Sequence, residues 1–76
     1  MGQAESNREL EQLLERYLAA HPNAADTVDG VRRWWLGDPA IAPDDVEAAL
    51  EALVTRGLLD KRRLPDGAAI YARSRR

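Results

Sequence analysis

The sequence of 76 residues contains no cysteine, no phenylalanine and only one histidine, His21. Without cysteine the chain can form neither a disulfide framework nor a thiolate metal site, so packing alone has to stabilise its core. There is no second histidine to complete a metal site and no glycine-rich phosphate loop. His21 stands beside Pro22 at an expected helix end, a place that suits contact with free carbonyls better than general-base catalysis. We therefore expect a protein that is not an enzyme and that needs no metal and no cofactor.

Long apolar runs are missing as well. No stretch approaches the roughly 20 apolar residues that a membrane-spanning helix needs. The first residues lack a basic region followed by an apolar stretch, so we expect no secretory signal and a cytoplasmic location. Residues 1–6, MGQAES, do match the N-myristoylation pattern that uses Gly2. Ser6 has an alternative interpretation as a helix cap, which we prefer.

Positive charge is scarce in the first part of the chain and negative charge in the last part, although the net charge is only -2. Residues 1–55 hold eleven acidic and four basic side chains, a sum of -7, whereas residues 56–76 hold two acidic and seven basic, a sum of +5. The hydrophobic content of 45% and the charged content of 32% describe a globular domain. A chain this short has room for one core, and we find no repeat and no interdomain linker.

The first predicted helix begins with a capping box, in which Ser6 and Glu9 satisfy each other's free backbone N–H groups. It ends before Pro22, which disfavours a helical residue in front of it. Its apolar positions recur at helical spacing on one face. They are Leu10, Leu13, Leu14, Tyr17 and Leu18.

Two more helices are predicted. One spans residues 27–36, is capped by Asp26 or Thr27 and is closed by Gly37. Its adjacent Trp34 and Trp35 point about 100° apart, so at least one of them is expected to be half exposed or more. The other begins at Pro43 and stops at Gly57. Its apolar positions are Val46, Ala49, Leu50, Leu53 and Val54.

The last part of the chain predicts a β-hairpin. Segments 58–64 and 68–74 flank Pro65-Asp66-Gly67, where proline presets the turn and glycine allows a positive φ. We expect a flexible start at residues 1–5, a domain at 6–74 and a disordered basic end at 75–76. The predicted core consists of Leu10, Leu14, Tyr17, Val31, Trp35, Val46, Leu50, Leu53 and Leu59.

This order of elements, with the stretch VEAALEALVTRGLLDKRRLPDGAAIY, resembles the winged-helix domains over about residues 8–74. The matching positions are Val46, Leu50, Leu53, Gly57, Leu58, Leu59 and Tyr71. The resemblance implies a mainly α fold with a small β-hairpin (α+β), in which three helices precede a C-terminal two-stranded wing. There are two departures. The connection GDPAIA is longer than the turn of a strict helix-turn-helix, and the third helix lacks the polar and basic side chains that read bases.

The exposed face of the third helix is acidic. Its carboxylates are Asp44, Asp45, Glu47 and Glu51. Four such charges oppose entry into a groove lined with phosphates, even though a carboxylate can accept a hydrogen bond from cytosine. Two interpretations remain. The carboxylates either complement the positive helix end and stay solvated, or they form a docking face for a basic protein together with an exposed Trp34 or Trp35.

The hairpin region is basic, and its candidate contacts to a nucleic-acid backbone are Arg56, Lys61, Arg62, Arg63 and Arg73. In winged-helix proteins this region can touch phosphate or the minor groove, so the resemblance implies a possible DNA-binding regulator. The alternative is a solvated hairpin whose cations pair with the domain's own carboxylates. We favour a protein-interaction module, with DNA contact through the wing as the alternative, and a homodimer is compatible with either.

Overall fold

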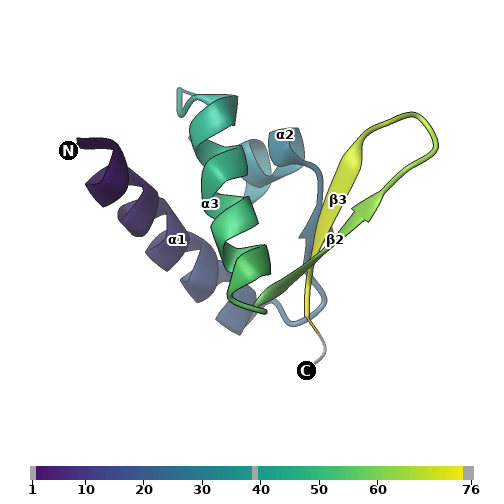
Figure 1. Ribbon diagram of the computed structural model, residues 1–76. Helices are drawn as coiled ribbons and strands as arrows, with labels where there is room; N and C mark the ends of the chain where they lie inside the picture. The colour runs from purple at the N-terminus through teal and green to yellow at the C-terminus, as the bar shows by residue number, and fades with distance from the viewer. Residues whose placement is uncertain (1, 39, 75–76) are drawn as a thin grey trace.

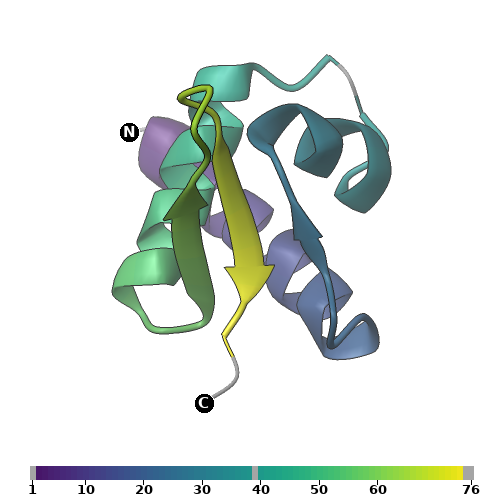
Figure 2. The same cartoon turned by 90° about the vertical axis from the view of Figure 1, so that its right-hand side faces the viewer.

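Helices and an antiparallel sheet form two layers in the computed structural model, which describes residues 2–38 and 40–74 and the side chains from Arg8 onward. The helices pack on one face of the three-stranded sheet (Figure 1). Figure 2 looks onto the opposite face, with the sheet in front and the helices behind or beside it. The expected α+β class is thus confirmed. The segment expected to be disordered, 75–76, lies outside the described residues, as does Met1.

Helix α1 spans Gly2–Ala20. It begins before Ser6, so the predicted start at a capping box is wrong. Gln3, Ala4 and Glu5 are all good helix formers, and a helix that continues through them removes the need for a cap at Ser6. The predicted end before Pro22 is confirmed, because the helix stops two residues earlier.

The second helical stretch is α2 (Val28–Gly30), continued directly by the π-helical turn η1 (Val31–Trp35). Thr27 is the N-cap, and its hydroxyl accepts a hydrogen bond from the Gly30 N–H at 3.2 Å. At the other end the Leu36 N–H donates to the Val31 carbonyl, five residues earlier, at 3.0 Å. The predicted helix therefore exists with its cap, but half of it is wound more widely than an α-helix.

Helix α3 spans Pro43–Thr55 and begins at the predicted proline. Its end at Gly57, where φ is 81°, is also as predicted. The Leu58 N–H donates to Leu53 O at 2.9 Å and the Gly57 N–H to Val54 O at 3.0 Å. These two bonds make a Schellman cap, which requires the left-handed conformation that glycine adopts without steric cost.

The sheet has the order β1-β3-β2, with β1 at Ala25–Asp26, β2 at Leu59–Arg63 and β3 at Ala69–Arg73. The predicted hairpin is β2 with β3, and its turn contains Gly67 at φ 91°. The sequence predicted only these two strands. Strand β1 pairs with β3 as well, Ala25 opposite Ala72 and Asp26 opposite Tyr71. Two residues are too few to show a strand period, so β1 could not be found from the sequence pattern.

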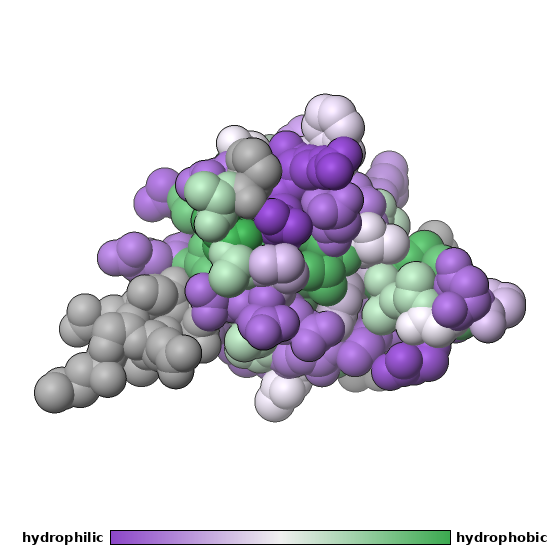
Figure 3. Space-filling model, turned by 90° about the horizontal axis from the view of Figure 1, so that it is seen from above, coloured by the Kyte–Doolittle hydropathy of each residue, from purple (hydrophilic) through white to green (hydrophobic). Residues whose placement is uncertain are grey.

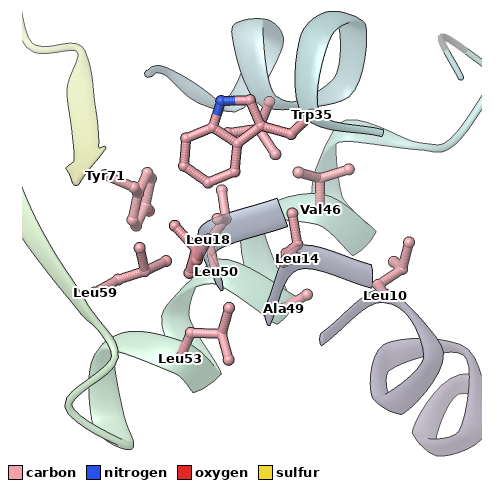
Figure 4. Packing of buried hydrophobic residues seen from close by; sticks show 11 residues of the cluster. Leu10, Leu14, Leu18, Trp35, Val46, Ala49, Leu50, Leu53, Leu59 and Tyr71 are labelled. Carbon is pink, nitrogen blue, oxygen red and sulfur yellow. The ribbon is translucent and has the colours of Figure 1, made fainter. Parts of the chain in front are cut away.

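The core lies between the helices and the inner face of the sheet (Figure 4). Eight of the nine predicted core residues are buried, and Tyr17 is only partly buried. Leu13 is the clearest error in the predicted helix stripe, since 46% of it is exposed. The core also contains Leu18, Ala49 and Tyr71. Tyr71 reaches it because strand β3 is the middle strand and turns this side chain toward the helices.

Candidate functional site

The two tryptophans have opposite environments. Trp34 is 72% exposed and Trp35 only 9%. The expectation that one indole stays exposed is confirmed: Trp34 is that indole, and Trp35 is buried, as the predicted core had it. It belongs to an aromatic stack in which the Trp35 and Tyr17 ring centres lie 5.1 Å apart and those of Tyr17 and His21 4.0 Å apart.

His21 therefore has a packing role that its sequence position did not indicate. The expected contact with free helix carbonyls is not seen within residues 2–38 and 40–74, where its ring lies on Tyr17 instead. The stack leads from the surface at His21 to the core at Trp35. This stacking holds Trp35, and with it the backbone of η1, against the core. The neighbouring Trp34 is therefore attached to an anchored backbone.

Trp34 is flanked by ion pairs on its own helical stretch. Asp29 forms ion pairs with Arg32 at 3.4 Å and with Arg33 at 3.3 Å. Arg32 also donates from Nε to the Ile41 carbonyl at 3.0 Å, which ties η1 to the connection before α3. The sequence did not indicate this tie, which spans the unusually long connection between the two helices. Trp34 thus projects from a stretch that is tied to the rest of the domain by the Arg32 hydrogen bond and by the buried Trp35.

The four carboxylates of α3 do not act as one face. Asp44 and Glu47 are exposed and Asp45 is partly buried, all without an ion pair in the described part of the chain. Glu51 differs, because its Oε2 accepts from Lys61 Nζ at 2.6 Å and from the Tyr71 hydroxyl at 2.5 Å. Glu51 therefore joins α3 to the hairpin, and its carboxylate is already engaged within the domain.

The electrostatics of this junction follow from its geometry. The hydrogen bond from Lys61, and then that from Tyr71, hold the pKa of Glu51 below its ordinary value of 4.5. Burial, with the carboxylate of Glu51 next to the hydroxyl, raises the pKa of Tyr71 above 10.0. The bond to Glu51 raises the pKa of Lys61. Each shift favours the hydrogen-bonded protonation state near neutral pH.

The basic residues of the hairpin region divide in the same way. Arg56 binds Glu11 and Glu15 of α1, each at 3.2 Å, and Lys61 binds Glu51. The Arg63 side chain donates to the Gly67 carbonyl at 3.4 Å. Among the described residues Arg62 and Arg73 form no ion pair. Arg56 and Lys61 thus follow the prediction of pairing within the domain, and Arg63 likewise has no ion pair in the described part of the chain, which leaves Arg62, Arg63 and Arg73 for an external anion.

The surface shows no single dominant apolar area on the face seen from above, where separate apolar patches lie between polar side chains (Figure 3). A shallow open depression is lined by Pro22, Asn23, Ala24, Ala25, Ala72, Arg73 and Ser74. In the described part of the chain no three His, Asp or Glu side chains come together in a way that could hold a metal ion. None of the described helices has the length and apolar character needed to cross a bilayer.

Searches against protein-family models, curated proteins and solved structures found no significant match.

Proposed function

We propose that this chain is a non-enzymatic, winged-helix-like binding module that holds a protein partner through Trp34. The observation that carries the proposal is the contrast between an indole left 72% exposed and its neighbour buried in an aromatic stack. Tryptophan is enriched among the residues that dominate protein interfaces. An indole on an anchored backbone has only its own two side-chain torsions to order on binding, which favours its use as an anchor.

The winged-helix assignment is part of the same proposal. Three helical segments, a Schellman-capped third helix and the β2–β3 hairpin support it. Within that assignment α3 corresponds to the helix that reads bases in DNA-binding members. Asp44, Asp45 and Glu47 oppose phosphate there, so this face suits a basic protein surface better than a DNA groove.

The test compares capture of native partners by the parent protein and by Trp34→Ala, with nuclease treatment throughout. Leu13→Ala is the matched control, since Leu13 is the other large hydrophobic residue exposed among the described side chains. Proteins that bind the parent and the control but not Trp34→Ala support the proposal. Equal capture by all three variants contradicts it, provided that their thermal midpoints agree.

The acidic face has a separate test. Asp44, Asp45 and Glu47 are replaced together by Ser, and both protein capture and affinity for duplex DNA are measured. We expect weaker protein capture and a DNA affinity that is unchanged or higher, because negative charge has been removed. Loss of specific DNA binding in this variant would show that α3 reads bases.

A second candidate function is contact with a nucleic-acid backbone through the wing. It is favoured by Arg62 and Arg73, which are exposed and form no ion pair within the described residues. The pairing of Arg56 and Lys61 with internal carboxylates weakens it, because fewer cations are left to bind phosphate. Binding of this kind would fall steeply as salt rises, since it releases counterions.

A further inference from the structure

Strand β2 leaves one backbone edge of the sheet open. It is the outer strand in the order β1-β3-β2. The Ser74 N–H donates to Leu58 O and the Leu64 N–H to Ala68 O, at 3.0 and 2.7 Å. In an antiparallel pair the residues that bond across the ladder alternate with residues whose N–H and C=O point away. The backbone groups of Leu59, Lys61 and Arg63 therefore face the outer edge.

This edge has no partner in the part of the chain that the structure describes. No backbone hydrogen bond outside the helices and strands involves Leu59, Lys61 or Arg63 there. Leu59 is buried near the end of α3, whereas Lys61, Arg62 and Arg63 are exposed. The accessible part of the edge therefore begins at Lys61. An unpaired edge with free donors and acceptors is a template for an added strand.

The charges of β2 determine which kind of strand can be added at its edge. Lys61, Arg62 and Arg63 stand in succession, and Asp60 is the only acidic residue of β2. A second copy paired through the same edge would bring the three cations of each chain close to those of the other, and this repulsion, which Asp60 offsets only in part, disfavours self-pairing. Successive side chains of a strand alternate between its two faces, so Arg62 lies on one face of β2 and Arg63 on the other. An added strand with carboxylates on either face would therefore meet one of these arginines, and Arg62 forms no ion pair within the described residues.

We propose that the free edge of β2 binds an acidic protein segment in extended conformation as a fourth strand. Backbone hydrogen bonds from Lys61 and Arg63 would supply affinity, and the cations of β2 would select acidic segments over neutral ones. The same charges protect the edge from pairing with uncharged strands or with other copies. The free edge of β2 is on the opposite side of the sheet from β1, and α2 lies on the β1 side (Figure 2). Trp34 belongs to η1, which continues α2, so the two proposed binding surfaces are distinct.

The probe is a short capped peptide in which glutamate alternates with valine, compared with the same peptide carrying lysine for glutamate. Binding is measured by amide hydrogen exchange and by titration at low salt. We expect the acidic peptide to bind, the basic one not to bind, and the amides of Lys61 and Arg63 to become protected. Absence of binding, or binding without this protection, overturns the proposal.

Two variants separate backbone pairing from side-chain attraction. Arg63→Ala and Arg63→Pro both remove the charge, but only proline also removes the outward N–H. Proline is tolerated on an edge strand at such a position. We expect Arg63→Pro to bind the acidic peptide about tenfold more weakly than Arg63→Ala, as loss of one interfacial hydrogen bond with an unsatisfied partner predicts. Equal affinities, with similar thermal midpoints, would mean that the peptide is held by charge alone and would overturn the added strand.

A short DNA duplex is the last arm of the experiment. Under the proposal it fails to displace the peptide at moderate salt and leaves the edge amides unprotected. Displacement together with a steep salt dependence would assign this edge to phosphate and overturn the proposal. Trp34→Ala should bind the peptide like the parent, so the proposal can fail or succeed independently of the proposed function.

Discussion

Replacing Tyr71 by phenylalanine should loosen the attachment of the hairpin to α3. Tyr71 is fully buried, and its hydroxyl donates to Glu51 Oε2 at 2.5 Å. Hydrogen bonds to charged groups contribute about 1.5 to 3 kcal/mol to stability. The Glu51 side chain is 43% exposed and can recover a water molecule, so we expect a smaller loss of about 1 kcal/mol. For a domain of this size that lowers the thermal midpoint by about 4 to 8 °C.

The assay is thermal unfolding of the parent, Tyr71→Phe, Glu51→Gln and the double variant. If the hydroxyl acts through Glu51, the two single losses do not add in the double variant. Additive losses, or an unchanged midpoint in Tyr71→Phe, would refute the reasoning. They would show that the hydroxyl contributes no stability through this carboxylate.

The pH dependence supplies a second readout of the same bond. The pKa of Glu51 is lowered by folding, so its contribution to stability is present above 4.5 and is lost as the pH falls through the folded-state value. The difference between the parent and Tyr71→Phe should therefore shrink in acid. The pKa of Tyr71 is raised by folding, so its contribution is lost as the pH rises above 10.0, and Tyr71→Phe should be free of this alkaline loss.

Four further changes test other parts of the structure. Leu50→Ala should cost about 2 to 5 kcal/mol of the roughly 4 to 11 expected for a chain of this length, measured by denaturant unfolding, and a smaller loss would mean that the α3 core is misplaced. Gly67→Val should lower the thermal midpoint because φ is 91° there, and an unchanged midpoint would contradict the turn. In Gly30→Ala the new Cβ would overlap the Asp26 carboxylate, which accepts from the Thr27 N–H at 2.8 Å, so the loss of stability should shrink in the background Asp26→Ala. If the wing binds duplex DNA, Arg62→Ala should lower the slope of affinity against salt by about one unit for any sequence, whereas no binding to random duplex at low salt excludes that function.

The regular parts of the fold could be predicted because their signals are local. Pro43 and Gly57 mark the bounds of α3, and Gly67 marks the hairpin turn. Strand β1 was missed because it exists only through its pairing with β3, far along the chain. The π-helical turn was missed for a related reason. It depends on which carbonyl accepts the hydrogen bond from the Leu36 N–H, and the residue types do not determine that choice.

The candidate site was predicted only where a single helix determines exposure. The angle between Trp34 and Trp35 was enough to expect one exposed indole. Helical periodicity also placed Glu51 on the outer face of α3, where it does lie. That pattern contains no information about β3, which brings Tyr71 beneath the carboxylate. A carboxylate that is exposed when its own helix is considered alone can thus be bonded to side chains of another element.

The strand order has a consequence for how the chain acquires its sheet. Strand β3, at Ala69–Arg73, is the last of the three to be synthesised, yet both other strands pair with it. Strands β1 and β2 therefore have no sheet partner until residues 69–73 have emerged from the ribosome. Until then Tyr71 is not packed against the helices. The nascent chain therefore exposes apolar helix surface that is buried in the folded domain. Without residues 69–73, neither β1 nor β2 would have a strand to pair with, so loss of this one segment would abolish the entire sheet.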